Sequence, residues 1–210
     1  VDNNYIIKEG NWIIYDDLFI PKDKKLIISA GTELKIINNS QIISKSPIIA
    51  IGLPDKKIFI NSPHNDYRIG QCIIILENQS TSIFENVEFN NLRNCDKGSI
   101  NSEGSLNVYK SKIKMKNIKF SNNKYGDDGL NFINSEFELD NVHLNNIYAD
   151  GLDLDYSVGT IKDFSCINCL NDGIDISNTT LRLENFDADD IFDKAISVGE
   201  NSIIEAKNIK

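Results

Sequence analysis

The sequence is poor in the features that mark linkers, membrane spans and several common active sites. It contains only four prolines and no long polar tract, so we expect neither a linker nor a disordered tail. No apolar run approaches the roughly 18 residues that a membrane-spanning helix needs, and we therefore expect no membrane insertion. The sequence also lacks a glycine-rich phosphate loop and a legible Ser-His-Asp arrangement.

Positive charge is scarce as well. The chain has 22 basic and 31 acidic residues, a formal net charge of −9, which argues against nucleic acid as a partner. The imbalance is concentrated between Asp127 and Asp193, where the only basic residues are Lys162 and Arg182. A bare surface of this kind would repel polymers of acidic sugars, since like charges oppose binding.

A short phrase recurs at intervals of 22 residues. Asp128–Phe132 returns as Asp150–Leu154, then as Asp172–Ile176, and fades at Lys194–Val198. A fixed period of this length indicates one structural unit stacked on copies of itself, and the short alternating apolar runs are typical of strands. The sequence therefore predicts an all-β fold, a right-handed single-stranded parallel β-helix (β-solenoid) with about 22 residues per coil.

The pattern suits one domain, in which residues 1–25 form N-terminal capping strands and residues 26–210 form the parallel β-helix. The regular spacing is broken once, and the excess residues fall in Arg93–Gly104, which predicts an inserted loop. The segment Asn208–Lys210 lies within a coil and is not followed by a capping element. Because solenoid ends normally need a cap, we expect further coils or end-to-end packing through the C-terminal coil.

Stacking at this period also predicts columns of side chains on neighbouring strands. One column alternates in charge at every step, and opposite charges on adjacent strands stabilise pairing, so its members are expected to be structural. A second column has nearly the same alternation. The first contains Lys116, Asp140, Lys162, Glu184 and Lys207, and the second Lys114, Glu138, Thr160, Arg182 and Glu205.

The aspartates of the repeated phrase stack like charge on like charge. Such carboxylates raise one another's pKa or recruit a cation, and several converging oxygens suit Ca²⁺. This interpretation predicts a calcium site formed by Asp150, Asp153, Asp155, Asp172 and Asp175. The alternative is that the first aspartate of each phrase caps a turn, with the following glycine at positive φ. A ladder of turn asparagines, Asn117, Asn141 and Asn185, is expected in either case.

The four cysteines form no obvious metal-binding set. Cys166 and Cys169 have the spacing of half a zinc or redox site, but both fall in core columns, and we interpret them as buried thiols. Cys72 and Cys95 could form a disulfide that ties the inserted loop down, although their spacing alone leaves this open.

Several segments carry a resemblance to known proteins. Phe19–Ile36 resembles the first coils of pectin-lyase-like right-handed parallel β-helices. Four later segments are similar to the β-helical region of bacterial surface proteins related to the spore-coat-protein-H group: Gly126–Gly129, Asp150–Asp155, Asn171–Ser177 and Asp193–Glu200. The resemblance covers nearly the whole chain and implies the right-handed parallel fold and an extracellular or cell-envelope setting. It brings no activity, because the kinase-like part of that group is absent.

Two functions are consistent with these features. The first is a non-catalytic surface module that binds polysaccharide or packs with neighbouring surface domains, with Asp153, Asp175 and Tyr156 as candidate substrate-binding residues. The second is a calcium-dependent lyase or epimerase acting on uronic-acid polymers. There the cation would neutralise the sugar carboxylate, and Lys194, or else Arg182, would act as the catalytic base. The first is favoured because the acidic region is poor in acid–base partners.

Overall fold

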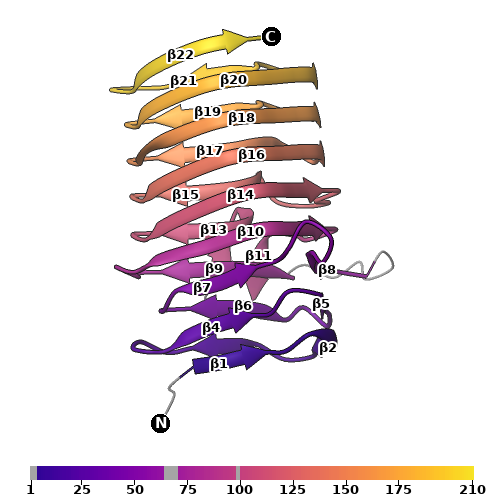
Figure 1. Ribbon diagram of the computed structural model, residues 1–210. Coiled ribbons are helices and arrows are strands. Elements are labelled where there is room, and N and C mark those ends of the chain that lie inside the picture. The colour runs from indigo at the N-terminus through magenta and orange to yellow at the C-terminus, as the bar shows by residue number, and fades with distance from the viewer. Residues whose placement is uncertain (1–3, 64–70, 98–99) are drawn as a thin grey trace.

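The computed structural model describes residues 4–63, 71–97 and 100–210. These residues form a parallel β-solenoid of about nine coils, with roughly 22–23 residues per coil and no helix among them. In Figure 1 strands such as β16 (Glu136–Ile147) cross the front to the right, and β17 (Asp150–Asp155) returns behind to the left as the chain rises. The coils therefore wind in the right-handed sense, and the predicted fold is confirmed.

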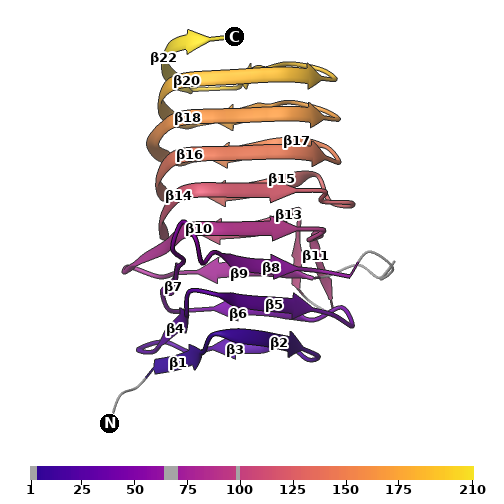
Figure 2. The same ribbon diagram turned by 45° about the vertical axis from the view of Figure 1, so that its right-hand side comes forward.

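Two parallel sheets make up the walls of the solenoid, and Figure 2 shows them stacked with the two termini at opposite ends. The larger, twelve-stranded sheet contains β1 (Asn4–Ile7), β2 (Gly10–Ile14), β4 (Lys25–Ile28), β5 (Thr32–Ile36), β7 (Ile48–Ile51), β8 (Ile58–Asn61), β10 (Thr81–Asn90), β14 (Lys112–Ser121), β16, β18 (Val158–Cys169), β20 (Thr180–Ile191) and β22 (Ile203–Ile209). The eight-stranded sheet contains β3 (Leu18–Ile20), β6 (Gln41–Ser44), β9 (Cys72–Leu76), β13 (Gly104–Tyr109), β15 (Asp128–Ile133), β17, β19 (Ile174–Ser177) and β21 (Ile196–Val198).

The long strands of the larger sheet share one bend, at a residue in the left-handed conformation that has the same position in each strand. Asn and Asp tolerate this conformation better than other non-glycine residues. The bend residues have φ between 52° and 59°, and neighbouring amides bond to each other, as from Asn117 Nδ2 to Asn86 Oδ1 (3.1 Å) and from Asn141 Nδ2 to Asn117 Oδ1 (2.9 Å). The predicted asparagine ladder is confirmed. The bend residues are Asn86, Asn117, Asn141, Asp163, Asn185 and Asn208.

The interior is a continuous column of aliphatic and aromatic side chains. Leu130, Leu152 and Ile174 are paired in register on β15, β17 and β19, and each has no exposed surface. Ile196 continues this column on β21 and packs against the core. Alternate residues of each strand point outward, so every second position of the eight-stranded sheet is available for surface chemistry.

The alternating charge column is present in the predicted register. Asp140 pairs with Lys116 on one side and Lys162 on the other, and Glu184 pairs with Lys162 and Lys207. The ammonium of Lys116 lies 3.7 Å from the Asp140 carboxylate, and that of Lys207 lies 3.1 Å from Glu184. The side chains of these two ion pairs are 44–69% exposed, so each pair contributes little to the free energy of unfolding.

Both cysteine pairs form disulfides. Cys72 and Cys95 are bonded with their Cα atoms 5.4 Å apart, which resolves the question that spacing left open. The interpretation of Cys166 and Cys169 as thiols is wrong, because they too are bonded, at a Cα–Cα distance of 6.4 Å. Asn168 has a φ of 56°, and this turn brings both sulfurs into the core, where neither cysteine is exposed.

The two ends of the solenoid carry partly exposed apolar side chains. Strands β1, β2 and β3, in the segment expected to cap the N-terminal end, pair in parallel with β4, β5 and β6 and so form the first coil. On the last coil, Val198 and Ile209 are half exposed. Packing of a partner on this coil stays a prediction.

Candidate functional site

The inserted segment folds over the outer face of the eight-stranded sheet. It contains an antiparallel hairpin of β11 (Cys95–Lys97) and β12 (Ile100–Ser102), in the region where an inserted loop was predicted. The Cys72–Cys95 disulfide ties the start of this hairpin to β9. The hairpin is therefore held as a wall beside the outward side chains of β9, β13 and β15.

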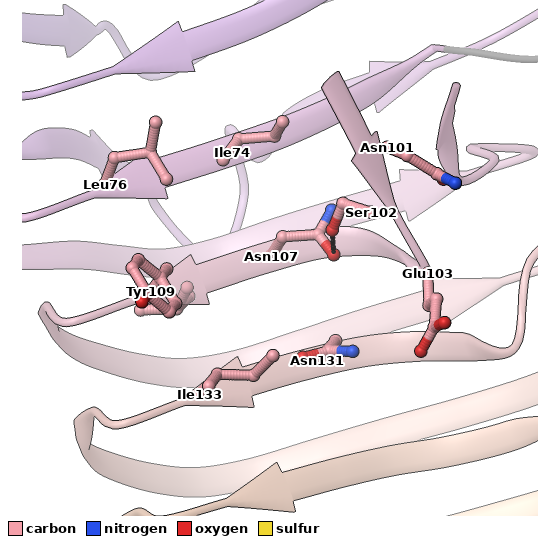
Figure 3. Close-up of a pocket in the computed structure, with 10 residues that line it drawn as sticks. Ile74, Leu76, Asn101, Ser102, Glu103, Asn107, Tyr109, Asn131 and Ile133 are labelled. Atoms are coloured by element: carbon pink, nitrogen blue, oxygen red, sulfur yellow. Dashed lines mark hydrogen bonds between the residues drawn. The ribbon is translucent and has the colours of Figure 1, made fainter. Parts of the chain in front are cut away.

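A groove of about 540 Å³ lies between the hairpin and this face, and we call it the hairpin groove. Figure 3 shows Leu76, Tyr109 and Ile133 toward one end, and Glu103 and Asn131 toward the other. An apolar, aromatic lining with a few fixed polar groups is typical of small-ligand sites. The lining residues are Ile74, Leu76, Asn101, Ser102, Glu103, Asn107, Val108, Tyr109, Asn131 and Ile133.

The amides in the groove are held by hydrogen bonds. Asn107 Oδ1 accepts from the backbone N–H of Gly104 (3.0 Å) and from the Ser102 hydroxyl, and its Nδ2 donates to the Gly104 carbonyl (2.6 Å). Asn131 Nδ2 donates to Asp128 Oδ2 at 2.6 Å. Because these contacts fix both side chains, a ligand would meet them in a set orientation.

Three carboxyl groups gather at the polar end of the hairpin groove: Glu103, Asp128 and Asp153, which we call the carboxyl cluster. Burial, followed by the charge of Asp153, raises the pKa of Asp128 from 3.8 to about 9. Burial, followed by four neighbouring carboxylates that include Glu103, raises the pKa of Asp153 to about 8. Near neutral pH Asp128 thus carries a proton and Asp153 does so most of the time.

The sequence identified Asp153 but missed Glu103 and the groove itself. Glu103 lies in the inserted segment, outside the repeat, so the period gives it no column. One signal was available, since Asn107 and Asn131 occupy the same column as Asp153 and Asp175. The sequence change from amide to carboxylate marks where the groove ends and the acidic surface begins.

The first aspartate of the phrase caps a turn at Asp150 and Asp172, as the alternative interpretation proposed, whereas the carboxyl of Asp128 accepts from the side chain of Asn131. Asp150 Oδ1 accepts from the backbone N–H of Asp172 (2.7 Å) and from Asn171 Nδ2 (2.7 Å). Asp172 Oδ1 accepts from the backbone N–H of Lys194 (2.8 Å). Burial raises the pKa of Asp150 to about 6, against the lowering effect of these bonds.

The glycine of the phrase has a different role from the expected one. Gly129, Gly151 and Gly173 are not among the glycines with positive φ, so that part of the interpretation is wrong. A Cβ on Gly151 would lie 2.5 Å from Cys166 Sγ and 2.5 Å from the carbonyl oxygen of Gly173. Glycine is needed here because adjacent coils approach too closely for a side chain.

The five proposed calcium ligands do not act alike. Asp150 and Asp172 are already committed to backbone N–H groups, whereas Asp153 and Asp175 are paired on adjacent strands and Asp155 lies beside them. Burial, then the charge of Asp175, raises the pKa of Asp155. Within residues 4–63, 71–97 and 100–210, no three His, Cys, Asp or Glu side chains form a group that could hold a metal ion. Asp153, Asp155 and Asp175 therefore do not form such a group in this arrangement, and the calcium site predicted at Asp150, Asp153, Asp155, Asp172 and Asp175 stays a prediction.

Both proposed catalytic bases, Lys194 and Arg182, pair with carboxylates. Lys194 contacts Asp193 and lies 3.7 Å from Asp172 Oδ1, and these carboxylates, Asp193 first, raise its pKa and keep it protonated. Arg182 lies on β20 of the other sheet and pairs with Glu205 at 3.0 Å. Tyr156 follows β17 at a corner of the coil, with its side chain exposed, and does not line the hairpin groove.

Comparisons with known proteins do not place the chain in a family. No family model, no curated protein and no solved structure matches it. Along the described residues, no helix has the length and apolar character needed to cross a bilayer. The parallel β-solenoid is consistent with a pectin-lyase-like fold, and the function must be argued from the surface of the coils.

Proposed function

We propose that the protein is a non-catalytic β-solenoid module that binds polysaccharide in the hairpin groove. The observation that carries this proposal is the lining of the groove, which is apolar and aromatic at one end and rich in fixed amides and carboxyls at the other. Sugar rings have apolar C–H faces and hydroxyl edges, so both kinds of surface have a partner on such a ligand.

The protonation of the carboxyl cluster favours uncharged sugars. With raised pKa values, Asp128 and Asp153 are largely neutral at pH 7, and a neutral carboxyl both donates and accepts hydrogen bonds. Sugar hydroxyls have the same double character. Polyuronates, by contrast, are negatively charged and would be repelled by the ionised carboxylates among the other acidic residues between Asp127 and Asp193.

An extracellular or cell-envelope location is part of the proposal. The two disulfides support it, because such bonds persist in oxidising compartments. The resemblance of the repeated segments to the β-helical region of bacterial surface proteins related to the spore-coat-protein-H group points the same way. In that setting the module would also pack with neighbouring surface domains.

The lyase or epimerase alternative needs an unprotonated base beside a bound cation. The salt-bridged Lys194 stays protonated, and Arg182 belongs to the other sheet. These placements support binding over catalysis.

Titration with glycan fragments tests the proposal. We expect isothermal titration calorimetry to detect binding of β-1,4-linked glucose or N-acetylglucosamine oligomers, and Tyr109→Ala, at the apolar end of the groove, to weaken it. The matched control is Tyr5→Ala, an exposed tyrosine on β1 of the larger sheet. Oligogalacturonate with Ca²⁺ should give no unsaturated product by ultraviolet absorbance. Absence of all glycan binding, or formation of that product, would contradict the proposal.

A further inference from the structure

An exposed row of apolar side chains lies where strands of the larger sheet end. Tyr148, Leu170 and Phe192 directly follow β16, β18 and β20, and Tyr125 lies in the connection after β14. The backbone N–H groups of Leu170 and Phe192 donate to Ile147 and Cys169 of the preceding coil, both at 3.0 Å, so these positions are one coil apart. We call these four side chains, Tyr125, Tyr148, Leu170 and Phe192, the apolar row.

The members of the apolar row are far more exposed than the core. Their exposed fractions are 41% for Tyr125, 51% for Tyr148, 52% for Leu170 and 82% for Phe192. The two tyrosine rings lie side by side, with centroids 5.8 Å apart and planes at 38°. The Arg93 guanidinium, only 1% exposed, lies 5.1 Å from the Tyr125 centroid and supports that ring. The rings therefore form a fixed platform at the surface.

A ladder of amides runs parallel to the apolar row. Asn122, Asn146 and Asn168 have φ values of 59°, 56° and 56°, and Nδ2 of each later residue donates to Oδ1 of the one before, at 2.9 Å and 2.7 Å. An amide has two N–H groups and two acceptor lone pairs, so the central residue keeps one of each beyond the ladder. A groove of about 430 Å³ lies between the apolar row and this amide ladder. Its lining residues are Asn123, Lys124, Tyr125, Asn146, Ile147, Tyr148, Asn168 and Leu170.

We propose that this groove is a second glycan-binding surface, which takes an extended, uncharged polysaccharide along the solenoid axis with about one pyranose ring per coil. The inference rests on the proposed function, since it names a further site for the same class of ligand. Stacking platforms and amide groups both repeat at the coil spacing, about 4.8 Å. An extended β-linked sugar chain advances by a comparable distance per ring and offers an apolar face and a hydroxyl edge at each step.

Other polymers fit this repeat less well. A polypeptide strand advances only about 3.3 Å per residue, so its side chains would fall out of register with the coils. Nucleic acid is disfavoured by the net charge of −9. Among the described residues that line the groove, Lys124 alone carries a charge, so the lining offers no repeating set of charges to a charged polymer.

Binding measured against ligand length tests the inference. We expect the affinity for β-1,4-linked glucose or N-acetylglucosamine oligomers to rise from two to four rings and then level off, because the apolar row offers four side chains. Tyr148→Ala should weaken binding of the four-ring oligomer about tenfold, the equivalent of one lost stacking contact. Leu170→Tyr should strengthen it several-fold by adding a ring to the platform. Tyr5→Ala is the matched control and should leave the affinity unchanged.

The variants separate this inference from the proposed function. If Tyr109→Ala abolishes binding while Tyr148→Ala and Leu170→Tyr leave it unchanged, the second surface is refuted and the hairpin groove stands. If only the substitutions at 148 and 170 change the affinity, the second surface stands and the hairpin groove is refuted. Absence of binding by the unaltered protein refutes both. If Tyr148→Ala lowers the melting temperature, its weaker binding is no longer informative. The gain in affinity expected from Leu170→Tyr then decides whether the second surface binds the oligomer.

Discussion

Replacing Asp128 with asparagine should stabilise the protein at neutral and alkaline pH. The Asp128 carboxyl is 3% exposed, and its pKa in the folded protein is raised from 3.8 to about 9. Between these two values the folded state holds a proton that the unfolded state has released. The free energy of unfolding of the unaltered protein therefore falls as pH rises through this range, and the loss is complete above about pH 9.

The size of the effect follows from the pKa difference. Each pH unit within the window costs about 1.4 kcal/mol per group, so Asp128 accounts for up to ~4 kcal/mol at pH 7. Asparagine has the shape of the protonated acid, keeps an oxygen for the Asn131 Nδ2 donor, and does not titrate. The melting temperature of Asp128→Asn should exceed that of the unaltered protein at pH 7 by roughly 8–16 °C at most, while the two should be similar at pH 4.

Circular dichroism melts from pH 4 to pH 9 at constant ionic strength measure this difference. The matched control is Asp127→Asn, the same substitution at the exposed neighbouring residue, which should leave most of the pH dependence in place because the charge of Asp127 is the smallest of the causes that raise the pKa of Asp128. The reasoning is refuted if Asp128→Asn is no more stable than the unaltered protein at pH 8. It is equally refuted if the stability of the unaltered protein rises from pH 5 to pH 8.

Two further predictions concern the stacking of the coils, and a third concerns calcium binding. Lys162→Glu should lower the free energy of unfolding by about 1–2 kcal/mol, because residue 162 faces acidic residues on both neighbouring strands. An unchanged urea midpoint would mean that the charges of the alternating column are fully screened. Gly151→Ala should cost about 1–3 kcal/mol, because its Cβ would lie 2.5 Å from Cys166 Sγ, and an unchanged melting temperature would contradict the close approach. The calcium prediction is checked by melts in millimolar Ca²⁺: binding should raise the melting temperature, and Asp153→Asn with Asp175→Asn should abolish the rise. An unchanged melt would leave turn capping as the explanation of the aspartates.

Much of the fold could be predicted because a solenoid is nearly one-dimensional. Each coil contacts only its neighbours, so a residue and its counterpart one period later are adjacent whatever the rest of the chain does. This is why the buried column through Leu152 and Ile174 and the charge pairs of Lys162 could be assigned from spacing alone. Side-chain alternation then separated inward from outward positions.

The local chemistry of the turns was harder to predict, because it depends on atoms of the next coil. The repeated Asp-Gly pair is equally compatible with a metal ligand and with a turn cap. The cap at Asp150 becomes visible only in the short contact from the Asp172 backbone N–H to the Asp150 carboxylate. In the same way, the left-handed conformation of Asn168, which turns Cys166 and Cys169 toward each other, has no signal in the spacing of the cysteines.

The coil, its register and the face on which acidic residues accumulate could be inferred from the repeat, because they follow from a period that acts between neighbours. The candidate sites depend on contacts between segments that the repeat does not relate. The hairpin groove exists because an insertion that breaks the period is tied to β9 by the Cys72–Cys95 disulfide. The same insertion brings Glu103 close to Asp153, although the two residues share no repeat position. The protonation of Asp128 likewise depends on burial by groups from several coils, a property of the assembled surface that no single repeat contains.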